Sequence, residues 1–327
     1  MELNFNDKNT KVQQLTNFIQ KFIAAHELQV GDKLPSINQL SKQFHLSRDT
    51  VFKAFSDLKA RNIIDSVHGK SYHVASRTKH VLLLLDEYTP FKELLYNTLK
   101  NKLPSYYEID LWFHQYNEYL FNQIINNSAG RYDSYLVMNY HNELFSEVLT
   151  KIDKKKLLFL DFGKFDKNGY SYICQDFDTA LYNALETIKS RLKKYRKLLF
   201  IFNKHHKHPQ SSKEYFSKFC IDNNLPFGII DEITEKMVIS KKIFYLVIKQ
   251  EDLVSIIKKG KQENFKAGRD YGLLAYNEIP FYEVIENGIA SIGINWERMG
   301  NRAADFIINE TPVQEFLPTE IILRNSL

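Results

Sequence analysis

The sequence predicts an α/β protein that joins an N-terminal winged helix-turn-helix to a larger part made of two doubly wound α/β lobes. Two helix starts separated by a tight turn, followed by a hairpin pattern, occupy the first quarter of the chain. Beyond them, short apolar runs alternate with helical patterns. With 327 residues the chain also exceeds one small domain. We expect an N-terminal domain at 1–75, a polar linker at 76–80 and the lobes at 81–327.

Two short phrases define the predicted helix-turn-helix. In Leu34-Pro35-Ser36 the serine is a plausible N-cap for a helix over 37–44, and Pro35 suits a helix start. After the break at His45-Leu46, Ser47 is a plausible N-cap for a second helix. The apolar residues of that helix follow the three and four residue spacing of one buried face: Val51, Ala54, Phe55 and Leu58. Its opposite face should therefore point to solvent, as in a recognition helix.

Flanking segments complete the domain. Helical spacing over 11–26 predicts a first helix that packs behind the other two. Strand patterns at 63–67 and 71–74 predict a small hairpin, with Gly69 at its tip. We expect the DNA contacts to come from the two helix starts and this tip: Ser36, Asn38, Ser47, Arg48, Asp49, Thr50, Lys53, His68, Gly69 and Lys70.

The charge distribution agrees with this assignment. Residues 1–78 contain 11 Lys and Arg against 7 Asp and Glu, whereas the remaining 249 residues contain 33 against 32. The basic excess is therefore concentrated in the part that would meet phosphate.

The residues of the predicted helix-turn-helix and hairpin, in this order, resemble the winged-helix domain of GntR-type bacterial transcription regulators. The resemblance covers roughly the first quarter of the chain, from Ile19 through Gly31 and the two serine phrases to His68-Gly69-Lys70. Two positions depart from the common pattern. Asn62 replaces a usual glycine, and asparagine tolerates the left-handed conformation. Phe52 stands where members of the family often carry a basic residue.

The rest of the chain alternates strand and helix patterns. Val81-Leu82-Leu83-Leu84-Leu85 is typical of a parallel strand buried on both faces. We expect further strands at 107–113, 134–138, 156–161, 197–202, 227–230, 243–248 and 271–276. We expect helices at 90–102, 118–127, 142–152, 179–193, 211–223, 250–259 and 296–308, and a crossing between the lobes at 170–177. About nine buried strands exceed one core, so the pattern predicts two lobes with a cleft between them.

This order of elements, with the phrases around Asp176 and from Ile292 to Gly300, resembles the sugar-sensing domain of LacI-type repressors and periplasmic sugar-binding proteins. A GntR-type head on a LacI-like domain implies a subgroup that includes arabinose- and fucose-responsive regulators of sugar operons. Other effector domains found on GntR-type heads fit less well. An all-helical domain lacks the buried strands, a chorismate-lyase-like domain is too short, and an aminotransferase-like domain needs a longer chain and a cofactor lysine.

Ligands of open α/β lobes bind beyond the carboxyl ends of the strands. Sugar hydroxyls need paired donors and acceptors, and the C–H face of a sugar needs an aromatic surface. The candidates at strand ends and crossings are Asp86, Tyr88, Phe91, Asn139, Asp161, Asp176, Lys213, Lys249, Gln250, Asn277 and Trp296. Asp176, Lys249 and Asn277 fall in phrases that align with ligand-contacting loops of the LacI-like family. An ordinary loop or capping role is the alternative for each candidate.

Several other classes of site are not indicated. Cys174 and Cys220 are too few for a disulfide framework or a cysteine-based zinc site. The stretch from His205 to His208 has adjacent rings that point apart and no nearby carboxylate at ligand spacing, so we interpret it as a solvated loop. Nucleophile-elbow, phosphate-loop and dinucleotide-binding motifs are absent among only 12 glycines. We therefore expect no cofactor, no metal and no enzymatic activity.

The sequence thus predicts a cytoplasmic DNA-binding regulator, because its start shows no secretory signal and no apolar run is long enough for a bilayer. Its expected partners are operator DNA, a monosaccharide or sugar phosphate, and a second copy of the chain in a homodimer. Repression relieved by sugar is the expected mode, and activation remains open. The alternatives are a sugar-binding receptor and an α/β enzyme with an appended nucleic-acid-binding head.

Overall fold

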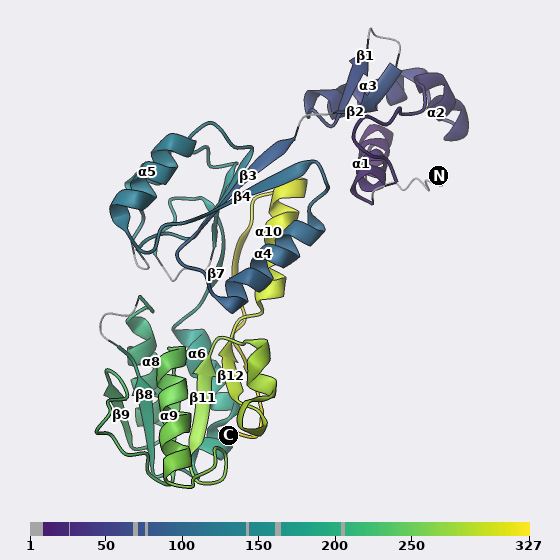
Figure 1. Cartoon of the computed structure of the whole chain (residues 1–327). Coiled ribbons are helices and arrows are strands. Elements are labelled where there is room, and N and C mark those ends of the chain that lie inside the picture. The colour runs from purple at the N-terminus through teal and green to yellow at the C-terminus, as the bar shows by residue number, and fades with distance from the viewer. Residues whose placement is uncertain are drawn as a thin grey trace. The chain divides into compact units, whose positions relative to one another are not determined.

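The computed structural model (Figure 1) describes residues 9–25, 27–67, 71–75, 78–141, 144–160, 165–203 and 207–327. The chain forms two compact units. One contains Met1–Val81 with Lys100–Asp110 and Arg131–Asp133, and the other contains Leu82–Leu99, Leu111–Gly130 and Ser134–Leu327.

The N-terminal unit contains the predicted helix-turn-helix and hairpin. Its elements are α1 (Lys11–Ala24), α2 (Ile37–Gln43), α3 (Arg48–Ala60), β1 (Ile64–Val67) and β2 (Ser71–Val74). The side chains of Thr10, Ser36 and Ser47 accept hydrogen bonds from backbone N–H groups in the first turns of α1, α2 and α3. The hairpin is antiparallel, with Ile64 opposite Val74. Asn62, just before it, has a φ of 56°, which confirms its left-handed conformation.

One apolar core holds these elements together. Leu15 and Ile19 of α1 lie in the same buried cluster as Val51, Phe55 and Leu58 of α3. These α3 residues recur at helical spacing, so burying them leaves the opposite face of α3 exposed.

The first lobe is built on a six-stranded sheet of order β13-β7-β6-β5-β3-β4. Its strands are β3 (Lys79–Leu85), β4 (Tyr107–Phe113), β5 (Ser134–Val137), β6 (Leu157–Leu160), β7 (Ser171–Gln175) and β13 (Gln314–Leu317). The pairs from β5 through β6 and β7 to β13 are parallel. Its helices are α4 (Pro90–Lys102), α5 (Glu118–Ser128), η1 (Glu147–Lys151) and α10 (Trp296–Asn309).

The second lobe has a six-stranded sheet of order β14-β12-β11-β10-β8-β9, parallel except for β14. Its strands are β8 (Lys197–Ile201), β9 (Phe227–Ile230), β10 (Ile243–Val247), β11 (Gly272–Tyr276), β12 (Ala290–Gly293) and β14 (Glu320–Ile322). Its helices are α6 (Thr179–Thr187), α7 (Lys189–Leu192), α8 (Ser211–Asp222), α9 (Gln250–Gln262), η2 (Pro280–Glu283) and η3 (Ile285–Asn287).

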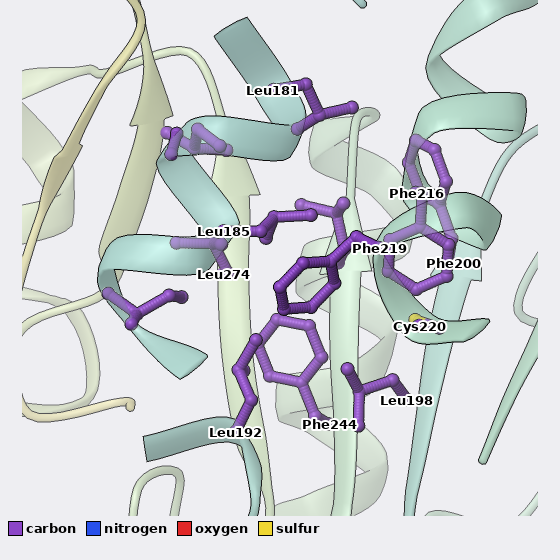
Figure 2. Close-up of a cluster of buried hydrophobic side chains, with 14 of the residues drawn as sticks. Leu181, Leu185, Leu192, Leu198, Phe200, Phe216, Phe219, Cys220, Phe244 and Leu274 are labelled. Atoms are coloured by element: carbon purple, nitrogen blue, oxygen red, sulfur yellow. The ribbon is translucent and has the colours of Figure 1, made fainter. Parts of the chain in front are cut away.

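Alternate residues of these strands bury on opposite faces of the second sheet. Leu198, Phe244 and Leu274 pack with Leu185 and Phe219 from α6 and α8, as Figure 2 shows. Their neighbours Leu199, Tyr245 and Leu273 belong to a second cluster that includes Leu253 and Ile256 of α9. Burial on both faces explains why these strands are continuous apolar runs.

The chain passes between the lobes three times, after β7, after β12 and after β13. The predicted α/β lobes are confirmed.

Two local predictions were wrong, and three strands were missed. The helix predicted at 142–152 is a 3-10 helix at Glu147–Lys151, and residues 142 and 143 lie outside the described residues. The segment 170–177, predicted only as a crossing, contains strand β7 inside the first sheet. Strands β12, β13 and β14 were not predicted.

None of the helices in the described residues combines the length and the apolar character that a membrane crossing requires.

Candidate functional site

The outward face of α3 is the first candidate site. Ser47 caps the helix: its Oγ accepts a hydrogen bond from the Thr50 N–H at 3.0 Å. Because Val51, Ala54, Phe55 and Leu58 are buried, Arg48, Asp49, Phe52 and Lys53 are left exposed on the first two turns. The major groove of DNA is wide enough to admit an α-helix, so this exposed stretch of α3 could enter it.

The charged side chains on this face differ in whether they already have an ion-pair partner. Lys53 Nζ lies 2.7 Å from Asp49 Oδ2, in an exposed pair one helical turn apart. The Arg48 guanidinium is exposed and has no hydrogen bond or ion pair to any residue that the structure describes. Arg48 is therefore free to contact a phosphate or a base edge.

The other predicted DNA contacts divide into two groups. Ser36, Ser47 and Thr50 use their hydroxyls locally: Ser36 caps α2, and the Ser47 and Thr50 hydroxyls lie 2.8 Å apart. Asn38 is exposed on the first turn of α2. His68, Gly69 and Lys70, the predicted hairpin tip, lie outside the described residues.

A cavity of about 460 Å³ is the second candidate site. It is lined by the β3–α4 loop of the first lobe and by the β10–α9 loop and the segment after β11 of the second lobe. The lining residues are Glu87, Tyr88, Thr89, Pro90, Phe91, Ile248, Lys249, Gln250, Glu251, Tyr276, Asn277, Ile279 and Tyr282. All three segments follow carboxyl ends of parallel strands, where open α/β folds bind ligands.

The lining contains buried polar atoms that have no hydrogen-bond partner among the described residues. Thr89 Oγ1 and Asn277 Oδ1 make no hydrogen bond within the part of the chain that the structure describes. The Asn277 N–H donates to the Ile292 carbonyl at 2.7 Å, and its φ of 64° is left-handed. The backbone thus fixes Asn277. Both side-chain atoms belong to residues that line the cavity, so they are candidate contacts for a hydroxyl-bearing ligand.

Aromatic rings supply the apolar part of the cavity. The Phe91 ring packs on Trp296 at a centroid distance of 4.8 Å. Tyr276 and Tyr282 are both buried, and burial raises the pKa of the Tyr282 hydroxyl. Tyr88 is 58% exposed. Together with the free polar atoms, these rings match a ligand that has hydroxyls on its edge and a C–H face.

The cavity also carries charge of both signs. Burial raises the pKa of the Glu87 carboxyl, and the nearby Lys92 ammonium opposes this rise. Lys249 and Glu251 flank the start of α9 at the same cavity. The lining therefore offers both hydrogen-bond donors and acceptors.

Five of the predicted ligand residues line this cavity: Tyr88, Phe91, Lys249, Gln250 and Asn277. Trp296 supports it indirectly, because it is 2% exposed and lies under Phe91. Its Nε1 has no hydrogen-bond partner among the described residues. Asp161 lies outside the described residues.

The structure gives four other candidates local roles. Asp86 is buried in an ion pair with Lys92 and also accepts a hydrogen bond from the Tyr116 hydroxyl at 2.6 Å. The Asn139 amide donates to the carbonyls of His141 and Leu144. Asp176 Oδ1 accepts from the Asp178 N–H at 2.9 Å.

The fourth, Lys213, places its ammonium 4.9 Å from the centroid of the Phe202 ring. None of these four belongs to the described lining of the cavity. Position at a strand end therefore did not distinguish residues that line the cavity from residues that make contacts within their own loops.

Sequence reasoning also missed part of the lining. Thr89 and Tyr276 lie next to predicted residues, so their place beyond a strand end was the available signal. Ile279 and Tyr282 come from the 3-10 segment after β11, which no periodic pattern indicated. No group of three or more His, Cys, Asp or Glu positioned for a metal ion occurs among the described residues, and His205 and His206 lie outside them.

Comparison with known families identifies the N-terminal domain. A family model described as bacterial regulatory proteins, gntR family, matches residues 11–74. Residues 11–74 form a gntR-family domain. The second helix of its helix-turn-helix is α3, which carries the exposed side chain of Arg48.

Two curated relatives match stretches of very different length. The chain is 34% identical over 68 residues to an uncharacterized HTH-type transcriptional regulator, YcxD, of Bacillus subtilis. This match covers 21% of the chain and only 15% of that relative. A second such regulator of B. subtilis, YydK, is 23% identical over 188 residues, which cover 50% of the chain and 80% of YydK.

Solved structures match about three quarters of the chain. The trehalose repressor from Escherichia coli superposes with a TM-score of 0.60 at 13% identity, over 75% of this chain and 100% of that one. A LacI family transcriptional regulator from Lactobacillus casei with bound glucose has a TM-score of 0.62 at 13% identity, over 76% and 100%. The two α/β lobes therefore have the LacI-type fold, as predicted.

Proposed function

We propose that the protein is a transcription regulator that represses a carbohydrate-utilisation operon and leaves its operator when a monosaccharide binds between the lobes. The observation that carries this proposal is the pairing of a gntR-family domain with a LacI-type fold that contains a cavity of about 460 Å³. In this proposal residues 1–75 bind DNA, 76–80 link the domains and 81–327 sense the ligand.

The effector is a small polyhydroxylated molecule of the monosaccharide class, free or phosphorylated. Unpaired Thr89 Oγ1 and Asn277 Oδ1 support hydroxyl recognition, and the rings of Phe91 and Tyr88 support contact with a C–H face. A structural relative crystallised with glucose supports the monosaccharide class, and one called a trehalose repressor supports a sugar effector more generally. Membership of the arabinose- or fucose-responsive subgroup stays a prediction.

The lining comes from both lobes, so a ligand that contacts both sides favours the closed arrangement. A ligand shifts such an equilibrium only by its difference in affinity for the two states. In a cytoplasmic homodimer, closure would change how two gntR-family domains are presented to a two-fold symmetric operator.

Gel shifts of full-length protein on promoter fragments at low salt test the DNA-binding part. Arg48→Ala should weaken operator binding about ten-fold or more, because a bidentate arginine–guanine contact contributes about 1–3 kcal/mol. Arg269→Ala is the matched control, since it removes an exposed arginine of the second lobe whose ion pair within the described residues is with Asp270. Equal weakening by both variants, or none by Arg48→Ala, would contradict the assignment.

Thermal-shift screening against pentoses, hexoses, deoxyhexoses and their phosphates tests the sensing part. A bound effector should raise the melting temperature, and the rise should grow with the logarithm of the effector concentration above its Kd. Arg48→Ala should retain this response, because Arg48 lies in the gntR-family domain and not in the cavity.

A further inference from the structure

Phe52 is an exposed aromatic residue on the recognition face of α3. Its side chain is 52% exposed. The residues one position away on either side differ: Val51 is fully buried and Lys53 is exposed in its pair with Asp49. No aromatic contact of the Phe52 ring occurs among the described residues.

Neighbouring groups restrict what this ring can meet. Arg48 lies one helical turn before Phe52 and has a free guanidinium, while Asp49 and Lys53 largely compensate each other's charge. The face therefore presents one available cation beside one apolar ring. An anionic surface with an apolar group near it is the complementary partner, and the major groove of DNA has both.

We propose that Phe52 reads the C5-methyl group of a thymine in the operator half-site. Among the four bases only thymine places a methyl group in the major groove, and phenylalanine is one of the side chains that contact it. This inference rests on the proposed DNA-binding function and adds a specificity-determining residue to it.

Spacing along the helix adds a prediction about the operator. Residues one turn apart on an α-helix are separated by about 5.4 Å, and successive base pairs by about 3.4 Å. Arg48 and Phe52 should therefore contact base pairs one or two steps apart. We expect each half-site to contain a thymine within two base pairs of the guanine that Arg48 contacts.

The test first selects an operator from a random duplex library with full-length protein. Each thymine of the half-site is then replaced in turn by uracil, which removes only the methyl group. For the unaltered protein, one position should lose about four-fold in affinity, the amount expected for one buried methyl group. Phe52→Ala should bind the thymine and uracil duplexes equally, and Phe52→Leu should retain part of the preference.

Two outcomes would overturn the proposal and differ in what else they affect. If an operator is selected but no thymine is sensitive to uracil, or if Phe52→Ala keeps the preference, the thymine contact is wrong while DNA binding stands. If no sequence is selected at all, the proposed DNA-binding function fails together with it. Circular dichroism of Phe52→Ala should match the parent, because alanine favours the helix and the site is exposed.

Discussion

Thr89 and Asn277 are lining residues of the cavity whose side-chain oxygens lack a hydrogen-bond partner among the described residues. Each buries a polar atom that has no partner among the described residues, and leaving such an atom unpaired costs about 1–3 kcal/mol. A hydroxyl of the ligand would remove this cost, so these two residues should contribute to affinity more than the exposed Tyr88.

Thr89→Val should weaken effector binding without destabilising the protein. The two side chains have nearly the same shape, and the lost hydroxyl has no partner to leave behind. We expect the effector Kd to rise about ten-fold, as for one hydrogen bond lost. Isothermal titration calorimetry measures this change with the sugar found by screening.

Thr319→Val is the matched control for this substitution. Thr319 also buries a hydroxyl without a partner among the described residues, but it does not line the cavity. Its effector Kd should equal that of the parent. An equal loss in both variants would place the effect in general packing and not in the cavity.

His114 gives the first lobe a defined dependence on pH. Its side chain is fully buried, Nε2 lies 3.1 Å from the Met138 carbonyl, and Nδ1 accepts from the Tyr116 N–H at 3.1 Å. Burial lowers the pKa of His114 to about 4. The folded state therefore holds the neutral ring at a pH where the unfolded chain is protonated.

The free energy of unfolding should consequently fall as the pH falls from about 6.5 to about 4. His114 should lower the free energy of unfolding by about 3 kcal/mol in total once the pH has fallen below about 4. Above pH 6.5 it should have no such effect. His114→Gln keeps a donor and an acceptor but cannot titrate in this range. Urea unfolding at pH 7, 6, 5 and 4.5 should show a weaker pH dependence for the variant, and an unchanged slope would rule out this role of His114.

Among the elements, long periodic ones were predictable and short ones were not. The cap serines and the buried spacing of α2 and α3 are local properties, so the helix-turn-helix followed from sequence. Strands β8, β10 and β11 also followed, since burial on both faces makes them continuous apolar runs. Strand β13 pairs with β7 about 140 residues earlier, and no local pattern signals such a pairing.

The cavity was predictable only in part for the same reason. Strand ends identified Tyr88, Lys249 and Asn277 as neighbours of a binding edge, because the rule for open α/β folds is general. Asp86 and Asn139 satisfy the same rule, yet their hydrogen bonds hold local loops. Which strand-end side chain faces the ligand depends on tertiary partners that the sequence does not display.

Helix α10 packs closely against α4 at Gly300. A Cβ atom there would lie 2.8 Å from the Leu95 carbonyl oxygen and 2.9 Å from Thr98 Cβ. Gly300→Ala should therefore push the helices apart and lower the free energy of unfolding by about 1–3 kcal/mol. Urea denaturation measures this loss. Glu297→Ala, at an exposed position of the same helix, should have little effect, and an equally stable Gly300→Ala would show that the helices are not in close contact.

At the scale of the whole molecule, the lobes should close when the effector binds. A ligand that touches the β3–α4 loop of one lobe and the β10–α9 loop of the other gains contacts on both sides only when they approach. Small-angle X-ray scattering should show a smaller radius of gyration at saturating sugar. Unchanged scattering at a sugar concentration that raises the melting temperature would contradict closure.

Operator affinity measured by fluorescence anisotropy, with and without saturating effector, tests the central claim most directly. The unliganded protein should bind its selected operator tightly at low salt, with an affinity that falls steeply as salt rises. Effector should raise the operator Kd at least ten-fold, and Thr89→Val should need correspondingly more sugar for the same release. Absence of operator binding at low salt, or an operator Kd that a bound sugar leaves unchanged, would contradict a gntR-family domain controlled by the cavity.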